Sequence, residues 1–326
     1  MTVTEIFRAA LAGEPVDRPP VFFTGGAWVG RVSGIPRDRL RGEARALVEA
    51  QVFVHEAVGQ DALLAYYDPL FIPEAWGCEL RFLETGPLVN PQPFQRIAGP
   101  PPRVGEGRMP VVLDAVTGLA EYGRGQVPVG TLIEGPFTTL SRIVDAEVVL
   151  RLAIKDPESL EDALTRVEAM LADFARAAVR AGADFLFVAD PVASASMISP
   201  VMYRRFALPP QQRLFAEAGA PVILHICGET SPILSAMGDS GAAALSLDQC
   251  MNLCQARSVI GDTCALAGNV DPLTLLMGTP EQVARETRTV MATGGSRRFL
   301  VMPGCGVPPP APLENVVAMV TAVHSG

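Results

Sequence analysis

The sequence predicts an α/β protein folded as a single (β/α)8 TIM barrel over residues 1–326. Two observations support this fold. Short apolar runs alternate along the whole chain with longer segments of helical periodicity, which is the pattern of β-α units around a parallel sheet. Eight such runs are present, and most are followed by polar or turn-forming residues, at the strand ends where a barrel of this kind builds its active site.

The predicted strands share a short apolar run that ends in a turn or opens a helix. They cover residues 20–24, 62–67, 129–133, 184–189, 222–226, 244–247, 266–269 and 299–302. No internal repeat or linker divides the chain, so we expect one domain.

The segments between the strands carry helix signals. Thr2 and Glu5 fit a capping box that opens the first helix. Apolar residues recur every three to four positions from 157 to 181, which predicts a helix with one face in the core, and Gly182 is expected to follow its end. Segment 87–110 is rich in proline, which suits neither a helix interior nor a central strand, so it is predicted to be an excursion over the barrel mouth between the second and third strands.

Composition narrows the class of protein. A chain of 326 residues with 49% hydrophobic content can bury a large core, and its longest apolar runs are shorter than the roughly 18 residues of a membrane span. The net charge of −9 argues against a nucleic-acid partner. Six cysteines in a chain of this length do not indicate a disulfide framework. We therefore expect a soluble, cytoplasmic protein with no membrane or nucleic-acid partner, whose cysteines are reduced thiols or metal ligands.

His225 and Cys227 stand at the end of the apolar run 222–226, two positions apart. Residues i and i+2 of a strand point to the same face, so both side chains can reach one ion. Cys305 follows another short apolar run and is a candidate third ligand. Two thiolates and one imidazole leave one coordination position open, as in a catalytic zinc site. The competing interpretation is that these cysteines are small buried hydrophobes, and spacing alone does not decide between the two.

Five short segments, in their order along the chain, carry a family resemblance. They are Val16-Asp17-Arg18-Pro19-Pro20, Gly135-Pro136-Phe137-Thr138, Ala189-Asp190-Pro191, Ile198-Ser199-Pro200 and Gly268-Asn269-Val270-Asp271-Pro272. On this strand pattern they resemble the uroporphyrinogen decarboxylase superfamily over nearly the whole chain. Within it, His225-Ile226-Cys227-Gly228 and Pro303-Gly304-Cys305-Gly306 are similar to the zinc-dependent methylcobamide methyltransferases, which implies zinc held by His225, Cys227 and Cys305.

The resemblance also implies a reaction. It is the transfer of a methyl group from a methylated corrinoid to a small acceptor, in the first place a thiol such as coenzyme M. No corrinoid-binding domain is recognisable in the sequence, so we expect the donor on a separate corrinoid carrier protein that docks at the barrel mouth. Tetrahydrofolate stays open as an alternative acceptor. The sequence leaves undecided the acceptor, the carrier, the fourth zinc ligand and the oligomeric state.

The ligand set suits this chemistry on physical grounds. A zinc ion with two thiolates and a neutral imidazole carries no net charge, so a bound acceptor sulfur stays electron-rich after it loses its proton. A decarboxylase acting on a porphyrinogen would instead need cations for its many carboxylates. The decarboxylases of the superfamily that this chain resembles carry an arginine-rich segment just after the first strand, which binds those carboxylates. Here residues 23–30 occupy that place, and no arginine precedes Arg31. A decarboxylase and a non-catalytic barrel that binds a corrinoid protein or a small ligand remain the alternatives.

Four further polar residues stand at predicted strand ends. Asp248 is a candidate for the fourth zinc position or for orienting a ligand, and Asp190 is a candidate catalytic residue on the other side of the site. Asn269 and Glu134 are candidates for binding the polar groups of the acceptor or cofactor. The alternative for each is a structural role, such as capping a helix.

Overall fold

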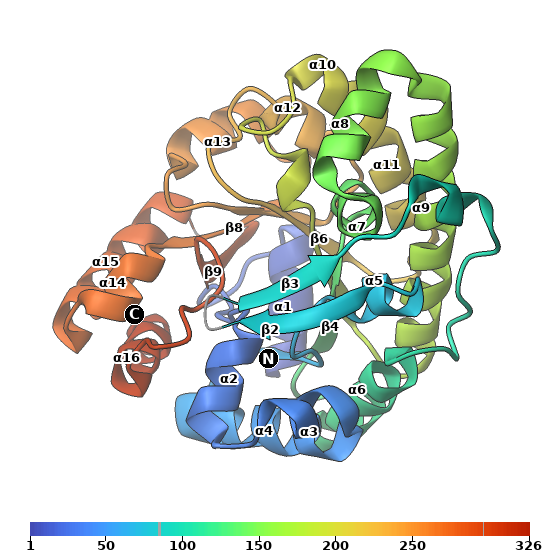
Figure 1. The fold of residues 1–326 in the computed structure, drawn as a ribbon. Coiled ribbons are helices and arrows are strands. Elements are labelled where there is room, and N and C mark those ends of the chain that lie inside the picture. The colour runs from blue at the N-terminus through green and yellow to red at the C-terminus, as the bar shows by residue number, and fades with distance from the viewer. Residues whose placement is uncertain (84–85, 296) are drawn as a thin grey trace.

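Seven parallel strands form the central sheet, in the order β1-β4-β5-β6-β7-β8-β9 (Figure 1). The computed structural model describes residues 1–83, 86–295 and 297–326. The strands are β1 (Leu63–Leu64), β4 (Val129–Glu134), β5 (Phe185–Ala189), β6 (Val222–Ile226), β7 (Ala244–Leu247), β8 (Ala265–Val270) and β9 (Phe299–Pro303). Their order follows the chain, as in a barrel built from successive β-α units.

The segment around Val21 takes the eighth place in the ring. Val21 forms a parallel bridge with Val301 of β9, and its carbonyl oxygen accepts a hydrogen bond of 2.7 Å from the backbone N–H of Asp61, just before β1. The predicted barrel is confirmed, but the predicted strand 20–24 is reduced to this bridge. Pro19 and Pro20 lack the N–H groups that a longer ladder would need.

Helices surround the strands on the outside (Figure 1). In chain order the helices are α1 (Val3–Ala12), α2 (Gly26–Ser33), α3 (Arg37–Gly42), α4 (Ala44–Val58), α5 (Phe71–Ala75), α6 (Met109–Gly123), α7 (Pro136–Val144), α8 (Ala146–Lys155), α9 (Pro157–Arg180), α10 (Pro200–Met202), α11 (Leu208–Glu217), α12 (Leu234–Gly238), α13 (Leu253–Ile260), α14 (Pro272–Met277), α15 (Pro280–Gly294) and α16 (Leu313–His324), with shorter helical turns η1 (Phe94–Ala98), η2 (Pro191–Ala193) and η3 (Tyr203–Ala207). Within the described residues, no helix is both long enough and apolar enough to span a bilayer.

The two helix signals read from the sequence are present. Thr2 and Glu5 form the capping box of α1, in which each side chain accepts from the other residue's backbone N–H. The predicted helix 157–181 is α9, which ends at Arg180. Gly182 follows with a φ of +112°, a conformation that residues with a Cβ rarely adopt. Local chemistry therefore sets these helix ends.

Helix α1 closes the N-terminal end of the barrel. Its Arg8 guanidinium lies 2.9 Å from the Asp184 carboxylate, just before β5. Its Phe7 side chain enters the barrel interior, where its ring lies 5.8 Å from that of Phe22 and 4.8 Å from that of Phe185. With apolar side chains filling this end, the polar chemistry of the interior is confined to the C-terminal strand ends.

An antiparallel hairpin, β2 (Glu79–Leu83) and β3 (Gly86–Asn90), interrupts the barrel between β1 and β4. In a two-stranded sheet both strands are edges, so the proline-rich segment contains no central strand, as expected. Arg37 and Arg41 of α3 stack on the Phe82 ring, with 4.3 and 4.4 Å to its centroid. The Gln92 backbone N–H bonds to the Ile143 carbonyl oxygen of α7, so the excursion packs beside α3, which precedes β1, and α7, which follows β4.

Candidate metal centre

A layer of polar side chains lines the barrel interior at its C-terminal end. Its members are Tyr66, Glu134, His225, Ser246 and Asn269. The residues two positions earlier all belong to the apolar cluster inside the barrel; they are Leu64, Leu132, Ile223, Ala244 and Ala267. Because alternate residues of a strand share a face, the polar set points inward as well. On these strands the inward side chains thus change from apolar to polar toward the C-terminal strand ends.

The three predicted metal ligands meet at this end of the barrel. His225 lies on β6, Cys227 follows that strand directly, and Cys305 follows β9. The His225 Nε2 atom lies 3.1 Å from the Cys227 Sγ, and the two sulfur atoms are 3.9 Å apart. The three ligand atoms lie within 4.8 Å of one another, and in the part of the chain that the structure describes no other group of His, Cys, Asp or Glu does so. The arrangement is that of a three-ligand metal site.

The imidazole of His225 is oriented from β7. Its Nδ1 atom lies 3.2 Å from both the carbonyl oxygen and the hydroxyl of Ser246, and its ring stacks on Phe187 with centroids 5.9 Å apart. When Nδ1–H donates to the Ser246 carbonyl, Nε2 is the free acceptor that faces the sulfurs, which is the tautomer a metal requires. Sequence reasoning missed Ser246 and Phe187, although both stand at inward positions of predicted strands.

The electrostatics of the two thiols fit a cation. The contact with Cys227, followed by that with His225, holds the pKa of the Cys305 thiol well below its usual range. The hydrogen bond to Cys305 and then burial raise the pKa of the Cys227 thiol. One sulfur therefore ionises readily, and the second does so only when a positive charge compensates it. Two sulfurs and one imidazole nitrogen are a donor set that zinc prefers, so the residues present fit the ion.

Asp248 holds the turn that follows Cys227. One carboxylate oxygen accepts from the Gly228 backbone N–H at 2.8 Å, and the other accepts from the Cys250 backbone N–H at 3.0 Å. The Asn269 side-chain amide donates to the Asp248 carbonyl oxygen at 2.9 Å and so fixes the same loop from β8. For Asp248 these contacts favour the orienting role over the fourth ligand position. Asn269 uses its amide group on the protein backbone.

Asp190 lies in a buried capping network. Its carboxylate accepts from the Thr138 backbone N–H at 2.7 Å and from the Gln211 side-chain amide at 2.8 Å, and Gln211 accepts in turn from the Tyr203 hydroxyl. Thr138 is in the first turn of α7, whose N-cap position is Gly135, so Asp190 supplies the cap that glycine lacks. Burial raises the pKa of this carboxyl. The network matches the structural alternative weighed for Asp190.

Glu134 differs from these residues because one of its oxygens is free. It ends β4, and its Oε1 atom accepts from Arg142 Nε at 3.2 Å. Its Oε2 atom is buried and has no hydrogen-bond partner among the described residues. Burial raises the pKa of this carboxyl to about 7, although the Arg142 charge opposes the shift. A carboxyl group with this pKa can accept or donate a proton near neutral pH.

The loop that carries Cys305 is held by α2. The Ala311 carbonyl oxygen accepts from the Trp28 indole N–H at 2.9 Å and from the Arg31 guanidinium at 2.5 Å. The Val307 backbone N–H donates to Thr24 at 2.8 Å. Arg31, the first arginine after the Val21 segment, thus has a structural contact to this loop.

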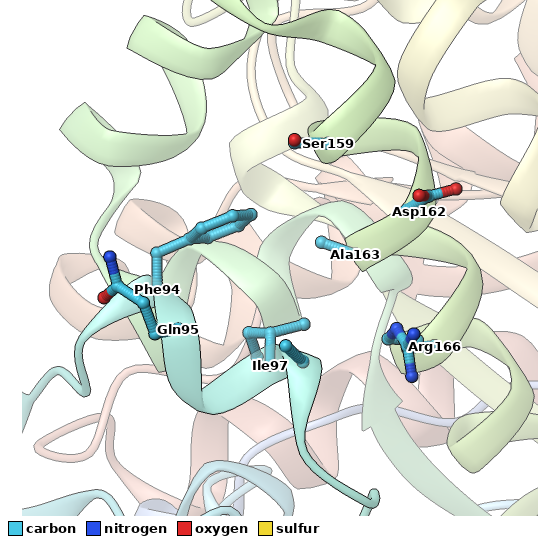
Figure 2. A pocket seen from close by; sticks show the side chains of 8 residues that line it. Phe94, Gln95, Ile97, Ser159, Asp162, Ala163 and Arg166 are labelled. Carbon is cyan, nitrogen blue, oxygen red and sulfur yellow. The ribbon is translucent and has the colours of Figure 1, made fainter.

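A separate cavity of about 270 Å³ opens between η1 and α9 (Figure 2). Phe94 and Ile97 of η1 face Ser159, Asp162 and Arg166 of α9 across it. Helix α9 lies on the outside of the barrel (Figure 1), and none of the three candidate metal ligands lines this cavity. It is therefore distinct from the metal centre.

The chain belongs to the uroporphyrinogen decarboxylase (URO-D) family, whose model matches residues 2–326. Among its relatives, methylcobamide:CoM methyltransferase MtaA of Methanosarcina barkeri is 32% identical over 326 residues, which is 96% of this chain and 95% of the relative. A methylated-thiol–coenzyme M methyltransferase of Methanosarcina mazei is 33% identical over 86% of this chain and 77% of the relative.

A solved structure agrees with these relatives. A methyltransferase from Methanosarcina mazei superposes with a TM-score of 0.93 and is 33% identical, covering 100% of this chain and 99% of that one. The family resemblance inferred from the sequence is thereby confirmed.

Proposed function

We propose that the protein transfers a methyl group from a methylated corrinoid to a small acceptor, in the first place a thiol such as coenzyme M, at a zinc ion held by His225, Cys227 and Cys305. The observation that carries the proposal is the convergence of one imidazole and two thiols at the open end of the barrel. The relatives named as methylcobamide:CoM methyltransferases support it. Zinc bound there would lower the pKa of an acceptor thiol while leaving its sulfur nucleophilic.

The protein's own residues prepare the site for this reaction. Ser246 fixes the imidazole of His225, and Asp248 fixes the turn after Cys227, so the ligands need little rearrangement. Because α1 fills the opposite end, the acceptor and the methyl group both approach from the mouth. The acceptor sulfur supplies the electron pair of the new sulfur–carbon bond. The electron pair of the broken cobalt–carbon bond stays on cobalt, which passes from Co(III) to Co(I). We propose that a separate carrier protein presents the corrinoid.

Uroporphyrinogen decarboxylation is the competing activity within the family. It would need cations at the mouth for the substrate's carboxylates. Residues 23–30 contain no arginine, and Arg31 is bonded to the Ala311 carbonyl oxygen. These contacts support methyl transfer over decarboxylation. Transfer to tetrahydrofolate would use the same methyl donor. An assay that offers thiols and tetrahydrofolate separately distinguishes the two acceptors.

Metal content and methyl transfer test the proposal together. After expression with added zinc, elemental analysis should find about one zinc per chain, as one three-ligand site requires. The Cys227→Ser, Cys305→Ser double variant should lose it. The zinc-loaded protein should demethylate methylcobalamin in the presence of coenzyme M, homocysteine, simple thiols or tetrahydrofolate, followed by the cobalamin spectrum. Full zinc retention in the double variant, or decarboxylation of uroporphyrinogen with no methyl transfer to any acceptor, would refute the proposal.

A further inference from the structure

Glu134 and His225 stand at the same level of the barrel, two strands apart. Glu134 of β4 pairs with Ala189 of β5, and Ala189 pairs with His225 of β6. Residues in register on parallel strands share a face, and the apolar residues below them show that this face is the interior. Their Cα atoms are therefore separated by two strand spacings, about 10 Å.

The position between them is occupied by a small side chain. Ala189 carries only a methyl group, and it is partly exposed whereas the preceding residues of β5 are buried. Solvent therefore reaches the barrel wall between Glu134 and the three metal ligands. A small acceptor whose sulfur meets His225, Cys227 and Cys305 can lie over Ala189, with its other end toward Glu134.

Arg142 brings a positive charge to that end. Its Nε atom is 3.2 Å from Glu134 Oε1, and its side chain is 43% exposed while that of Glu134 is only 5% exposed. Among the residues that the structure describes, its two Nη groups have no hydrogen-bond acceptor, in contrast to Arg41, which bonds both Asp68 and Glu74. The contact with Glu134 thus leaves guanidinium donors available beside the mouth.

We infer that Arg142, positioned by Glu134, binds an anionic group at the end of the acceptor remote from its sulfur. The inference rests on the proposed function and narrows its acceptor to a small thiol with a sulfonate or carboxylate. A guanidinium can give such a group two parallel hydrogen bonds. With the side chains extending inward from Cα atoms about 10 Å apart, the remaining space suits a chain of about two or three carbons.

The free oxygen of Glu134 is consistent with this ligand. When Glu134 is protonated, Oε2–H can donate to the same anion. Arg142 faces this carboxyl from α7, Asp190 from the end of β5 and Asp68 from the segment after β1. The two neighbouring carboxylates favour the protonated form of Glu134, whereas Arg142 disfavours it. Glu134 thus serves as a positioning residue for Arg142 and as a second donor.

Thiols that share a two-carbon chain and differ only in the end group test the inference. They are 2-mercaptoethanesulfonate, 2-mercaptoethanol and 2-mercaptoethylamine, each assayed with methylcobalamin and the zinc-loaded protein. The sulfonate should have a kcat/KM about 10- to 100-fold above that of the neutral thiol, the range expected for a hydrogen bond to a charged group. The amine should be the poorest acceptor.

Variants of Arg142 separate binding from catalysis. Arg142→Gln should raise KM for the sulfonate about 10- to 100-fold and reduce the advantage of the sulfonate over 2-mercaptoethanol by the same factor. Arg142→Lys should recover part of the loss, since it restores the charge without the fork of donors. Arg151→Gln is the matched control, because Arg151 pairs with Glu147 on the surface of α8. It should leave all three thiols unaffected.

Calorimetry without a methyl donor gives a readout independent of transfer. The zinc-loaded wild type should bind the sulfonate more tightly than 2-mercaptoethanol, and Arg142→Gln should remove the difference. If neither a thiol nor tetrahydrofolate is methylated, the proposed function fails, and the inference fails with it. If only tetrahydrofolate is methylated, the inference alone fails. If the thiols are methylated without regard to their end group, or Arg142→Gln affects all three equally, the inference alone is overturned.

Discussion

The His225 Nδ1 atom lies 3.2 Å from the carbonyl oxygen of Ser246, across the β6–β7 pairing. The acceptor in this contact is a backbone carbonyl oxygen, which is present whatever side chain stands at position 246. The Ser246 hydroxyl, also at 3.2 Å, is the part that a substitution removes.

Ser246→Ala should therefore retain zinc, with an affinity lowered less than 10-fold, whereas a full loss of such a partner costs about 10- to 100-fold. His225→Ala, which removes a ligand, should reduce bound zinc far below one per chain. Competition with a chromophoric chelator measures both affinities. Equal losses in the two variants would show that the hydroxyl, rather than the carbonyl, orients the ring.

Asp248→Asn tests whether the carboxylate orients the site or binds the metal. An asparagine keeps one acceptor oxygen but presents N–H groups to the second backbone donor, so one of the two loop contacts is lost. We expect full zinc stoichiometry with an affinity about 10-fold lower. Asp239→Asn, at a surface site beside Arg204, serves as the control. Loss of zinc stoichiometry in Asp248→Asn would instead assign the fourth ligand to Asp248.

Asp190→Ala should act on stability. The change leaves the Thr138 backbone N–H and the Gln211 amide buried without their acceptor, so the free energy of unfolding should fall by about 2 to 4 kcal/mol. Asp156→Ala, which removes the exposed N-cap of α9, should cost only about 1 kcal/mol. Denaturant unfolding measures both. A variant of Asp190 that unfolds like the wild type but no longer transfers methyl groups would instead support the catalytic role predicted from the sequence.

Glu134 should make stability depend on pH. Its pKa is about 7 in the folded protein, raised by burial, against 4.5 as the ordinary value. The folded state then holds the proton more tightly than the unfolded state. The corresponding stability is fully present below about pH 4.5 and is lost as pH rises through 7, a change of about 3 kcal/mol.

Glu134→Gln should abolish this contribution. Unfolding free energies at pH 5 and pH 8, compared between the wild type and the variant, isolate it because the other ionisable groups are common to both. The wild type should lose stability relative to the variant between the two values. A difference that is constant with pH would mean that Glu134 titrates in its ordinary range.

The fold and the pairing of His225 with Cys227 could be predicted from the sequence because both depend on local periodicity. Cys305 was a candidate from its place after another apolar run, and the family resemblance supported it. Alternation in the run 222–226 places His225 and Cys227 on one face, whatever the rest of the chain does. Arg142 and Ser246 were missed for the opposite reason. Arg142 reaches Glu134 only because of the way α7 packs after β4, and Ser246 reaches His225 only because of the register of β6 with β7.

Polar residues at strand ends were harder to interpret. Asp190 and Asp248 both occupy positions typical of catalytic carboxylates, yet in the structure their oxygens bond to backbone N–H groups or to a buried amide. A carboxylate that caps a helix and one that acts on a substrate have the same sequence pattern. Only the positions of nearby donors distinguish them.

The closure of the barrel by Phe7 has a kinetic consequence for the proposed reaction. With one end filled, acceptor and carrier share a single entrance. The acceptor then has to enter before the carrier covers the mouth, and the methylated product leaves after the carrier dissociates. Steady-state kinetics should accordingly follow a compulsory order, in which a high concentration of carrier slows turnover by trapping product beneath it.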